Sequence, residues 1–271
     1  MKNKNLVIYV FATLMLMSCG GGNSTRTAKI DGISFDSIVT DTTVRLLDGE
    51  ADSPACHLRL SIQYAKGDKL AGMINDSLIH SGILTPDYLA LGKESMNIKH
   101  AIDSFLTRYI SDYLKEYAPL YKQDRENSPS YSTEYLVNTK TQNGRDGIVN
   151  YLADVYSYGG GAHGSQQTIV KNINTSNGQV LTLQDVFVPG FEHGLNEKIL
   201  GELCDKYDAK DLEELREQGI LMSIDVYPTD NFILEKDDIV FIYVEDEIAP
   251  HAVGEIRVSL PYSDLDHILK K

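Results

Sequence analysis

The segment of the chain best suited to chemistry is a glycine-rich run that ends in histidine. Its candidate binding residues are Tyr158, Gly159, Gly160, Gly161 and His163. Backbone N–H groups of such a loop can bind an anion, and a histidine can act as a base or a metal ligand. The run lacks the lysine of a phosphate-binding loop and the serine of a nucleophile elbow. We therefore expect either a tight connection between strands, with glycines at positive φ, or a binding loop.

Catalysis by His163 would require a partner carboxylate, and Asp154 and Asp185 are the candidates. The sequence contains no His-Glu-x-x-His motif and no histidine at metal-ligand spacing from His163. A hydrolase is therefore the remote alternative, and the sequence predicts no enzyme, no metal site and no cofactor. Asp185 is expected instead to cap the segment 186–187.

The first 18 residues predict a bacterial lipoprotein signal peptide. Lys2 and Lys4 precede an apolar run, residues 6–17, which is too short for a membrane-spanning helix. The run ends in Leu-Met-Ser-Cys, which is typical of a lipobox, so we expect acylation of Cys19 and a flexible tether after it. Two or more acyl chains anchor stably, because each buried methylene contributes roughly 0.8 kcal/mol. The expected location is the periplasmic face of the outer membrane, with display on the cell surface as the open alternative.

Composition narrows the class of partner. The chain has 271 residues, with 39 acidic and 25 basic residues and a formal net charge of −14. Removal of the two signal-peptide lysines would make it more negative still. An acidic surface repels nucleic-acid phosphates and favours either cationic partners or simple solubility.

Cys56 and Cys204 are the cysteines that remain besides the lipobox residue. In an oxidising periplasm they could form a disulfide between the two halves of the chain. Cys56 lies in a strand-like run and Cys204 near the apolar face of an expected helix, so two separate buried thiols are the equal alternative. Their spacing fits neither a zinc site nor a redox Cys-x-x-Cys motif.

Hydrophobic periodicity predicts an α+β fold, with antiparallel sheets, packed helices and two intimately associated subdomains. The expected helices are 70–80, 97–118 (stopped by Pro119), 190–207, 211–218 and a last helix capped at Ser263. The expected strands are 57–64, 131–141, 148–158, 166–174, 180–183, 231–234, 239–244 and 254–260. The loop 143–147 predicts a hairpin, and residues 19–49 are expected to form a tether with an edge strand.

Four segments carry a resemblance to a known family: 156–163, 181–187, 248–254 and 256–265. Together they resemble a bacterial extracytoplasmic pair of domains of unknown function. This pair occurs in the lysozyme-binding ectodomain of the anti-sigma factor RsiV, beside the catalytic domain of the peptidoglycan deacetylase PdaC, and as stand-alone lipoproteins in Bacteroides-like bacteria. The resemblance implies a PdaC-type domain over 50–165 and an RsiV-type domain over 166–271. His251 stands where the family usually has an aromatic residue.

The resemblance implies binding rather than catalysis. The RsiV-type receptor binds lysozyme, a basic cell-wall hydrolase, and such a partner suits an acidic chain. We therefore expect a lipid-anchored envelope module, held to the membrane through Cys19, that binds a basic protein such as lysozyme. The alternative partner is peptidoglycan or another glycan, for which the exposed tyrosines and the loop at 159–164 would matter most.

Overall fold

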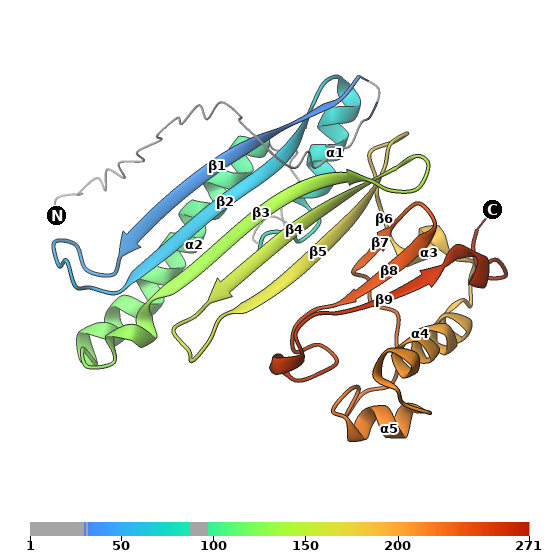
Figure 1. Ribbon diagram of the computed structural model, residues 1–271. Coiled ribbons are helices and arrows are strands. Elements are labelled where there is room, and N and C mark those ends of the chain that lie inside the picture. The colour runs from blue at the N-terminus through green and yellow to red at the C-terminus, as the bar shows by residue number, and fades with distance from the viewer. Residues whose placement is uncertain (1–29, 31, 87–96, 271) are drawn as a thin grey trace, which may run out of the picture.

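A computed structural model describes residues 30, 32–86 and 97–270 of the chain. The fold is α+β, as the sequence predicts. A six-stranded sheet with helices forms the N-terminal unit, and a smaller three-stranded sheet with helices forms the C-terminal unit (Figure 1).

The larger sheet follows the order of its strands along the chain. These strands are β1 (Ser34–Arg45), β2 (Ala55–Lys66), β3 (Thr133–Asn143), β4 (Ile148–Tyr158), β5 (Ser165–Asn174) and β6 (Val180–Leu181). Neighbours are antiparallel except β2 and β3, which run parallel because two helices form the crossover between them. β1 occupies the edge, where the sequence predicts an edge strand within the tether region.

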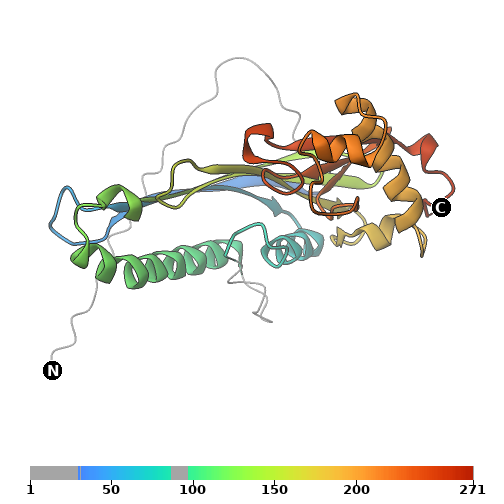
Figure 2. The same ribbon diagram turned by 90° about the horizontal axis from the view of Figure 1, so that it is seen from below.

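Helices α1 (Lys69–Ile79) and α2 (Ile98–Gln123) cover one face of this sheet, as Figure 2 shows. Alternate residues of β2 and β3, such as Leu58 and Val137, point to the helices and are buried against Phe105 and Tyr113 of α2. The aromatic side chains of α2 therefore serve largely to pack this helix on the sheet. A 3₁₀ turn, η1 (Ser128–Tyr131), leads from α2 to β3.

The predicted end of the long helix before Pro119 is wrong, because α2 continues to Gln123. Proline lacks an N–H, so its insertion costs a helical hydrogen bond. The turn after Pro119 nevertheless buries Tyr121, whose ring lies 5.9 Å from that of Tyr131. Burial of this aromatic side chain offsets the lost hydrogen bond.

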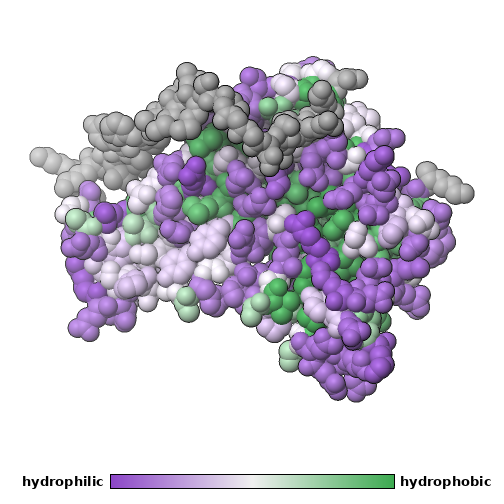
Figure 3. Space-filling model, in the orientation of Figure 1, coloured by the Kyte–Doolittle hydropathy of each residue, from purple (hydrophilic) through white to green (hydrophobic). Residues whose placement is uncertain are grey.

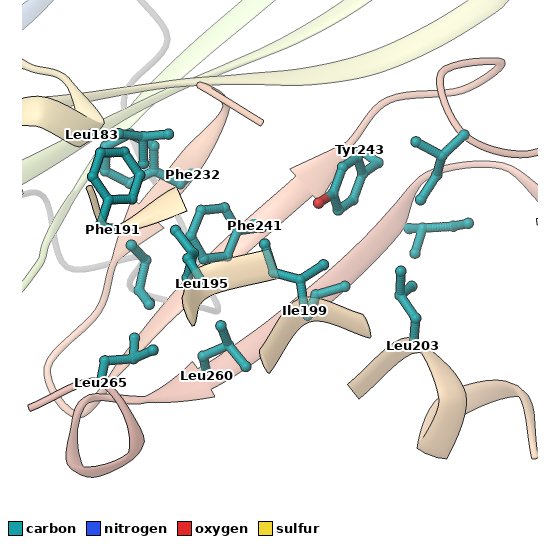
Figure 4. Packing of buried hydrophobic residues seen from close by; sticks show 14 of the residues in the cluster. Leu183, Phe191, Leu195, Ile199, Leu203, Phe232, Phe241, Tyr243, Leu260 and Leu265 are labelled. Atoms are coloured by element: carbon teal, nitrogen blue, oxygen red, sulfur yellow. The ribbon is translucent and has the colours of Figure 1, made fainter. Parts of the chain in front are cut away.

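The C-terminal unit packs helices on one face of its small sheet. Its elements are α3 (Leu183–Val186), α4 (Glu192–Tyr207), α5 (Leu212–Glu217), β7 (Phe232–Leu234), β8 (Asp238–Tyr243), η2 (His251–Val253), β9 (Ile256–Pro261) and η3 (Tyr262–Asp264). Figure 4 shows Leu195, Ile199 and Leu203 of α4 among buried residues of the sheet such as Phe241 and Leu260.

Two local predictions for this unit have different outcomes. Asp185 has a capping role, but at the start of α3 rather than for the predicted segment 186–187: it lies within the helix and accepts the N–H of Thr182 in a capping box. The predicted last helix at Ser263 is wrong, because the chain there makes only the 3₁₀ turn η3. Leu265 and Ile268 are buried after this turn, and the backbone N–H of Val188 bonds to the carbonyl of Ile268. The end of the chain is thus held by packing and hydrogen bonding against α3 and the residues that follow it, rather than by a helix of its own.

The predicted division between the two domains at 165/166 falls at the wrong place. β5 pairs with β4 along its length, and β6 pairs with the end of β5, so both strands belong to the larger sheet. The division lies near residue 182, between β6 and α3. The edge of β5 faces the C-terminal unit.

Three asparagines join the two units through hydrogen bonds that are buried or partly buried. Asn150 of β4 donates to the carbonyl of Leu234, and Asn172 of β5 bonds both to the carbonyl of Phe232 and to the N–H of Leu234. Asn231 donates to the carbonyl of Thr168 and accepts from Val170. Around them lies an apolar contact made by Leu152, Val170, Ile233, Val240 and Ile242. The units are therefore joined by specific hydrogen bonds and an apolar contact.

Both cysteines in the described part of the chain are free and buried. Cys56 packs in the core of the larger sheet and Cys204 in that of the C-terminal unit. The alternative of two separate buried thiols agrees with the structure, whereas a disulfide between the halves does not. Burial raises the pKa of both thiols, which favours their protonated form.

Helix α4 offers a matched test of the C-terminal core. Ile199 is fully buried, so Ile199→Ala is expected to lower the free energy of unfolding by about 2–5 kcal/mol. Gly201 lies in the same helix with open space where a Cβ would project, so Gly201→Ala is expected to raise it by about 0.5–1 kcal/mol. Urea denaturation measures both. Equal effects of the two changes would contradict the packing of α4 described above.

Candidate functional site

The glycine-rich run connects β4 to β5 and packs tightly against its surroundings. Gly160 has φ +81°, and a Cβ there would overlap the carbonyl oxygen of Ser130. A Cβ on Gly164 would overlap the ring of Tyr156. The hydroxyl of Tyr158 donates to the carbonyl of Gly161, 3.0 Å away. These glycines thus permit close contacts of the backbone with η1 and with the tyrosines of β4.

The glycine-rich loop brings His163 into contact with a second loop, residues 244–255, which follows β8. The rings of His163 and His251 are stacked, with centroids 4.0 Å apart and an interplanar angle of 25°. The sequence separately marked the glycine-rich run and the segment around His251. The structure brings them into contact across the junction of the two units.

Two carboxylates of the second loop lie beside this histidine pair. The Nδ1 atom of His251 is 3.1 Å from Oδ2 of Asp246 and 3.5 Å from Oε1 of Glu245. Asp246 is exposed and has φ +65°, a conformation that Asp and Asn adopt more readily than most residues. The site therefore has an acidic rim on the side of β8.

Glu245 also binds the edge of the larger sheet, as the first of three acceptors along β5. Its Oε2 accepts the N–H of Gln166 at 2.9 Å. Glu255 accepts the N–H of Thr168 at 3.0 Å, and the acceptor of Val170 is Asn231, at 2.8 Å. Alternate N–H groups along the free edge of β5 are thus bonded to side chains of the C-terminal unit. These bonds fix the position of the second loop relative to the first.

An exposed apolar surface adjoins the acidic rim. Met222, Ile224 and Val253 expose 64%, 38% and 43% of their surface. A shallow groove is lined by Gly219, by residues 222–224 and by residues 246–250. Leu221, which precedes Met222, donates its N–H to the carbonyl of Ile248 and so holds this segment beside the second loop. Sequence reasoning missed this surface, because an apolar run at 220–224 resembles a buried segment.

The carboxylates named for the hydrolase alternative are engaged elsewhere. Asp154 lies 3.2 Å from the ammonium of Lys140, and Asp185 accepts hydrogen bonds from Thr182. The bonds from Thr182 also lower the pKa of Asp185. Among the described residues, no group of three or more side chains of metal-binding type is placed to hold an ion. The arrangement around His163 is suited to contact with a ligand by ring surfaces, carboxylates and apolar side chains.

Cys19, the predicted lipidation site, lies outside the described residues. Within the described part of the chain, no helix is both long enough and apolar enough to cross a bilayer.

Comparisons with known proteins agree with this architecture. Residues 184–263 match the model of a protein family of unknown function, DUF3298. The chain is similar to the crystal structure of a DUF3298 family member from Bacteroides fragilis NCTC 9343, with 26% identity, a TM-score of 0.78, and coverage of 90% of this chain and 96% of that one. It also shares the fold of a DUF3298 family protein from Pseudomonas aeruginosa PAO1, at 16% identity and a TM-score of 0.59, with coverage of 89% and 95%. No curated protein matches the chain significantly. The C-terminal unit thus carries a DUF3298 match, and the site lies where this unit meets the larger sheet.

Proposed function

We propose that this chain is a lipid-anchored, non-enzymatic binding module of the bacterial envelope whose ligand is a basic protein, such as a lysozyme-like cell-wall hydrolase. The observation that carries the proposal is the convergence of two loops at the stacked pair His163 and His251. These two loops (159–164 and 244–255), called the paired loops below, and the neighbouring segment 219–225 together present ring surfaces, carboxylates and apolar side chains.

Charge supports a cationic partner. The chain has a formal net charge of −14, and the second loop contributes the exposed Asp246 at the site itself. Asp225, in the neighbouring segment 219–225, is also exposed and forms an ion pair with Arg216. Complementary charge accelerates encounter with a basic protein and selects against acidic ones. Attraction of this kind is screened by salt, since the Debye length falls from about 10 Å at 0.1 M to about 3 Å at 1 M.

The exposed apolar residues support a protein rather than a small ion as the ligand. Interfaces typically combine an apolar centre with a polar rim, and methionine is enriched at their centres. Met222 and Ile224 supply such a centre, and Asp246 and Glu247 line the same groove. The choice of a lysozyme-like partner rests on the family resemblance to the lysozyme-binding ectodomain. The lipid anchor rests on the lipobox at Cys19.

Binding to a c-type lysozyme tests the proposal and its electrostatic part. The protein is the chain from residue 19 with Cys19→Ser, which removes the acylation site. We expect a Kd of roughly 1 µM or tighter at about 50 mM salt and clear weakening at about 500 mM, measured by calorimetry. Asp246→Asn, which keeps the backbone conformation, is expected to weaken binding at low salt by about fivefold and to reduce the salt dependence. Asp205→Asn, on the exposed face of α4, is the control.

Absence of binding at both salt concentrations would contradict a lysozyme-like partner. Equal weakening by Asp246→Asn and Asp205→Asn would show that only total charge matters, and would contradict the site.

The histidine stack gives a second prediction. His163 is exposed and contacts His251 rather than a core residue, so His163→Ala is expected to leave stability nearly unchanged. It is expected to weaken lysozyme binding about tenfold, because it removes a ring at the point where the paired loops meet. His193→Ala, at an exposed position of α4, is the matched control. Affinity that is unchanged by His163→Ala would move the binding surface away from the paired loops.

A further inference from the structure

Part of one face of the larger sheet remains at the molecular surface. The C-terminal unit covers this face over β4 and β5, where Leu152 and Val170 contact its sheet. Figure 3 shows the face from the front: colours from pale to purple extend over much of the sheet beside the C-terminal unit, and green is seen around that unit and in a smaller area near β1 and β2. The exposed sheet surface is thus mostly polar or of intermediate hydropathy.

A groove of about 410 Å³ lies on this surface, at the end of the sheet near the glycine-rich loop. It is lined by Ala55, His57, Ser132, Thr133, Glu134, Tyr156 and Tyr158. Strand register explains the cluster: His57 of β2 lies beside Glu134 of β3, which lies beside Tyr158 of β4. Tyr156 shares their face because side chains alternate along a strand.

Internal contacts hold the groove in shape. The Nε2 atom of His57 lies 3.0 Å from Asp41 of β1, and its Nδ1 lies 3.9 Å from Glu134. The hydroxyl of Tyr158 is bonded to Gly161, and Gly164 packs on the ring of Tyr156. The glycine-rich loop therefore positions both tyrosines, a role separate from its contact with the second loop.

The groove can hydrogen-bond in both directions. The hydroxyls of Ser132 and Tyr156 donate and accept, whereas the hydroxyl of Tyr158, which donates to Gly161, and the carboxylate of Glu134 accept. His57 offers its Nδ1 atom, because its Nε2 is bonded to Asp41. The tyrosine rings add flat apolar surfaces. A matching ligand carries many hydroxyl groups and also flat apolar patches.

Charge around the groove disfavours anionic ligands. Asp41 and Glu134 would repel a phosphate or carboxylate. Arg59, the next residue of β2 on this face, is exposed and lies opposite Asp41, so it offsets one of these two negative charges. A neutral, hydroxyl-rich molecule meets none of these penalties.

We propose that this groove is a saccharide-binding site, in which a neutral sugar ring packs on Tyr156 or Tyr158 and bonds to Glu134 and His57. The proposal rests on residues other than the histidine pair and stands independently of the proposed binding to a basic protein.

Titration of the ¹⁵N-labelled chain, from residue 19 with Cys19→Ser, with chitotriose and separately with maltotriose tests the site. At least one trisaccharide is expected to shift the backbone amide signals of His57, Glu134 and Tyr158, with a Kd of roughly 1 mM. Absence of shifts at these residues with both sugars up to about 20 mM would overturn the proposal. Shifts confined to other surfaces would overturn it equally.

A pair of variants on β3 tests whether the groove is the site of sugar binding. Glu134→Gln keeps the shape of the side chain but removes its charge, and is expected to weaken sugar binding at least about fivefold, because hydrogen bonds to charged groups are the stronger ones. Asn138→Ala, on the same face of β3 but outside the groove, is expected to leave the affinity unchanged. Lysozyme binding is expected to be the same in both variants, which separates this site from the paired loops. Unchanged sugar affinity in Glu134→Gln, or equal losses in both variants, would contradict the assignment.

Discussion

The structure depends on how the N–H groups along the free edge of β5 find hydrogen-bond acceptors. A strand edge presents unpaired N–H groups, which cost free energy when they are buried and invite aggregation when they are exposed. Glu245, Glu255 and Asn231 accept the N–H groups of Gln166, Thr168 and Val170 in turn. Because all three acceptors come from the C-terminal unit, the edge of one sheet specifies where the other unit docks. Hydrogen bonds to carboxylates are among the stronger ones, contributing about 1.5–3 kcal/mol each.

This docking explains why the site exists. Loops can be placed accurately only by the rigid elements at their ends. The glycine-rich loop leads into β5, and Glu245 lies in the loop that carries Asp246 and His251. Bonding of Glu245 to the edge of β5 thus sets the distance between the loops and allows the imidazole stack. The same glycine-rich loop holds the tyrosines on the open sheet face, so one segment supports two surfaces of different chemistry.

Local features of the fold were predictable from the sequence because they depend on neighbouring residues. Alternation of apolar and polar residues predicted the strands β3, β4 and β5, and the loop 143–147 predicted the hairpin between β3 and β4. Features that depend on distant contacts were not predictable. The continuation of α2 through Pro119 depends on burial of Tyr121, and the true division near residue 182 depends on pairing of β5 with β4. The candidate loop was marked by its composition, but its contact with the second loop and the exposed apolar residues beside it arise only from docking.

Amide hydrogen exchange along β5 tests this account most directly. Thr168 lies at the sheet edge, yet its N–H is expected to be protected in the native protein because Glu255 accepts it. In Glu255→Ala, its exchange is expected to accelerate about tenfold or more. Exchange at Gln167 and Ile169, whose N–H groups point toward β4, is expected to stay unchanged. Rapid exchange of Thr168 in the unmodified protein, or no acceleration in Glu255→Ala, would contradict the claim that the C-terminal unit docks by satisfying the edge of β5.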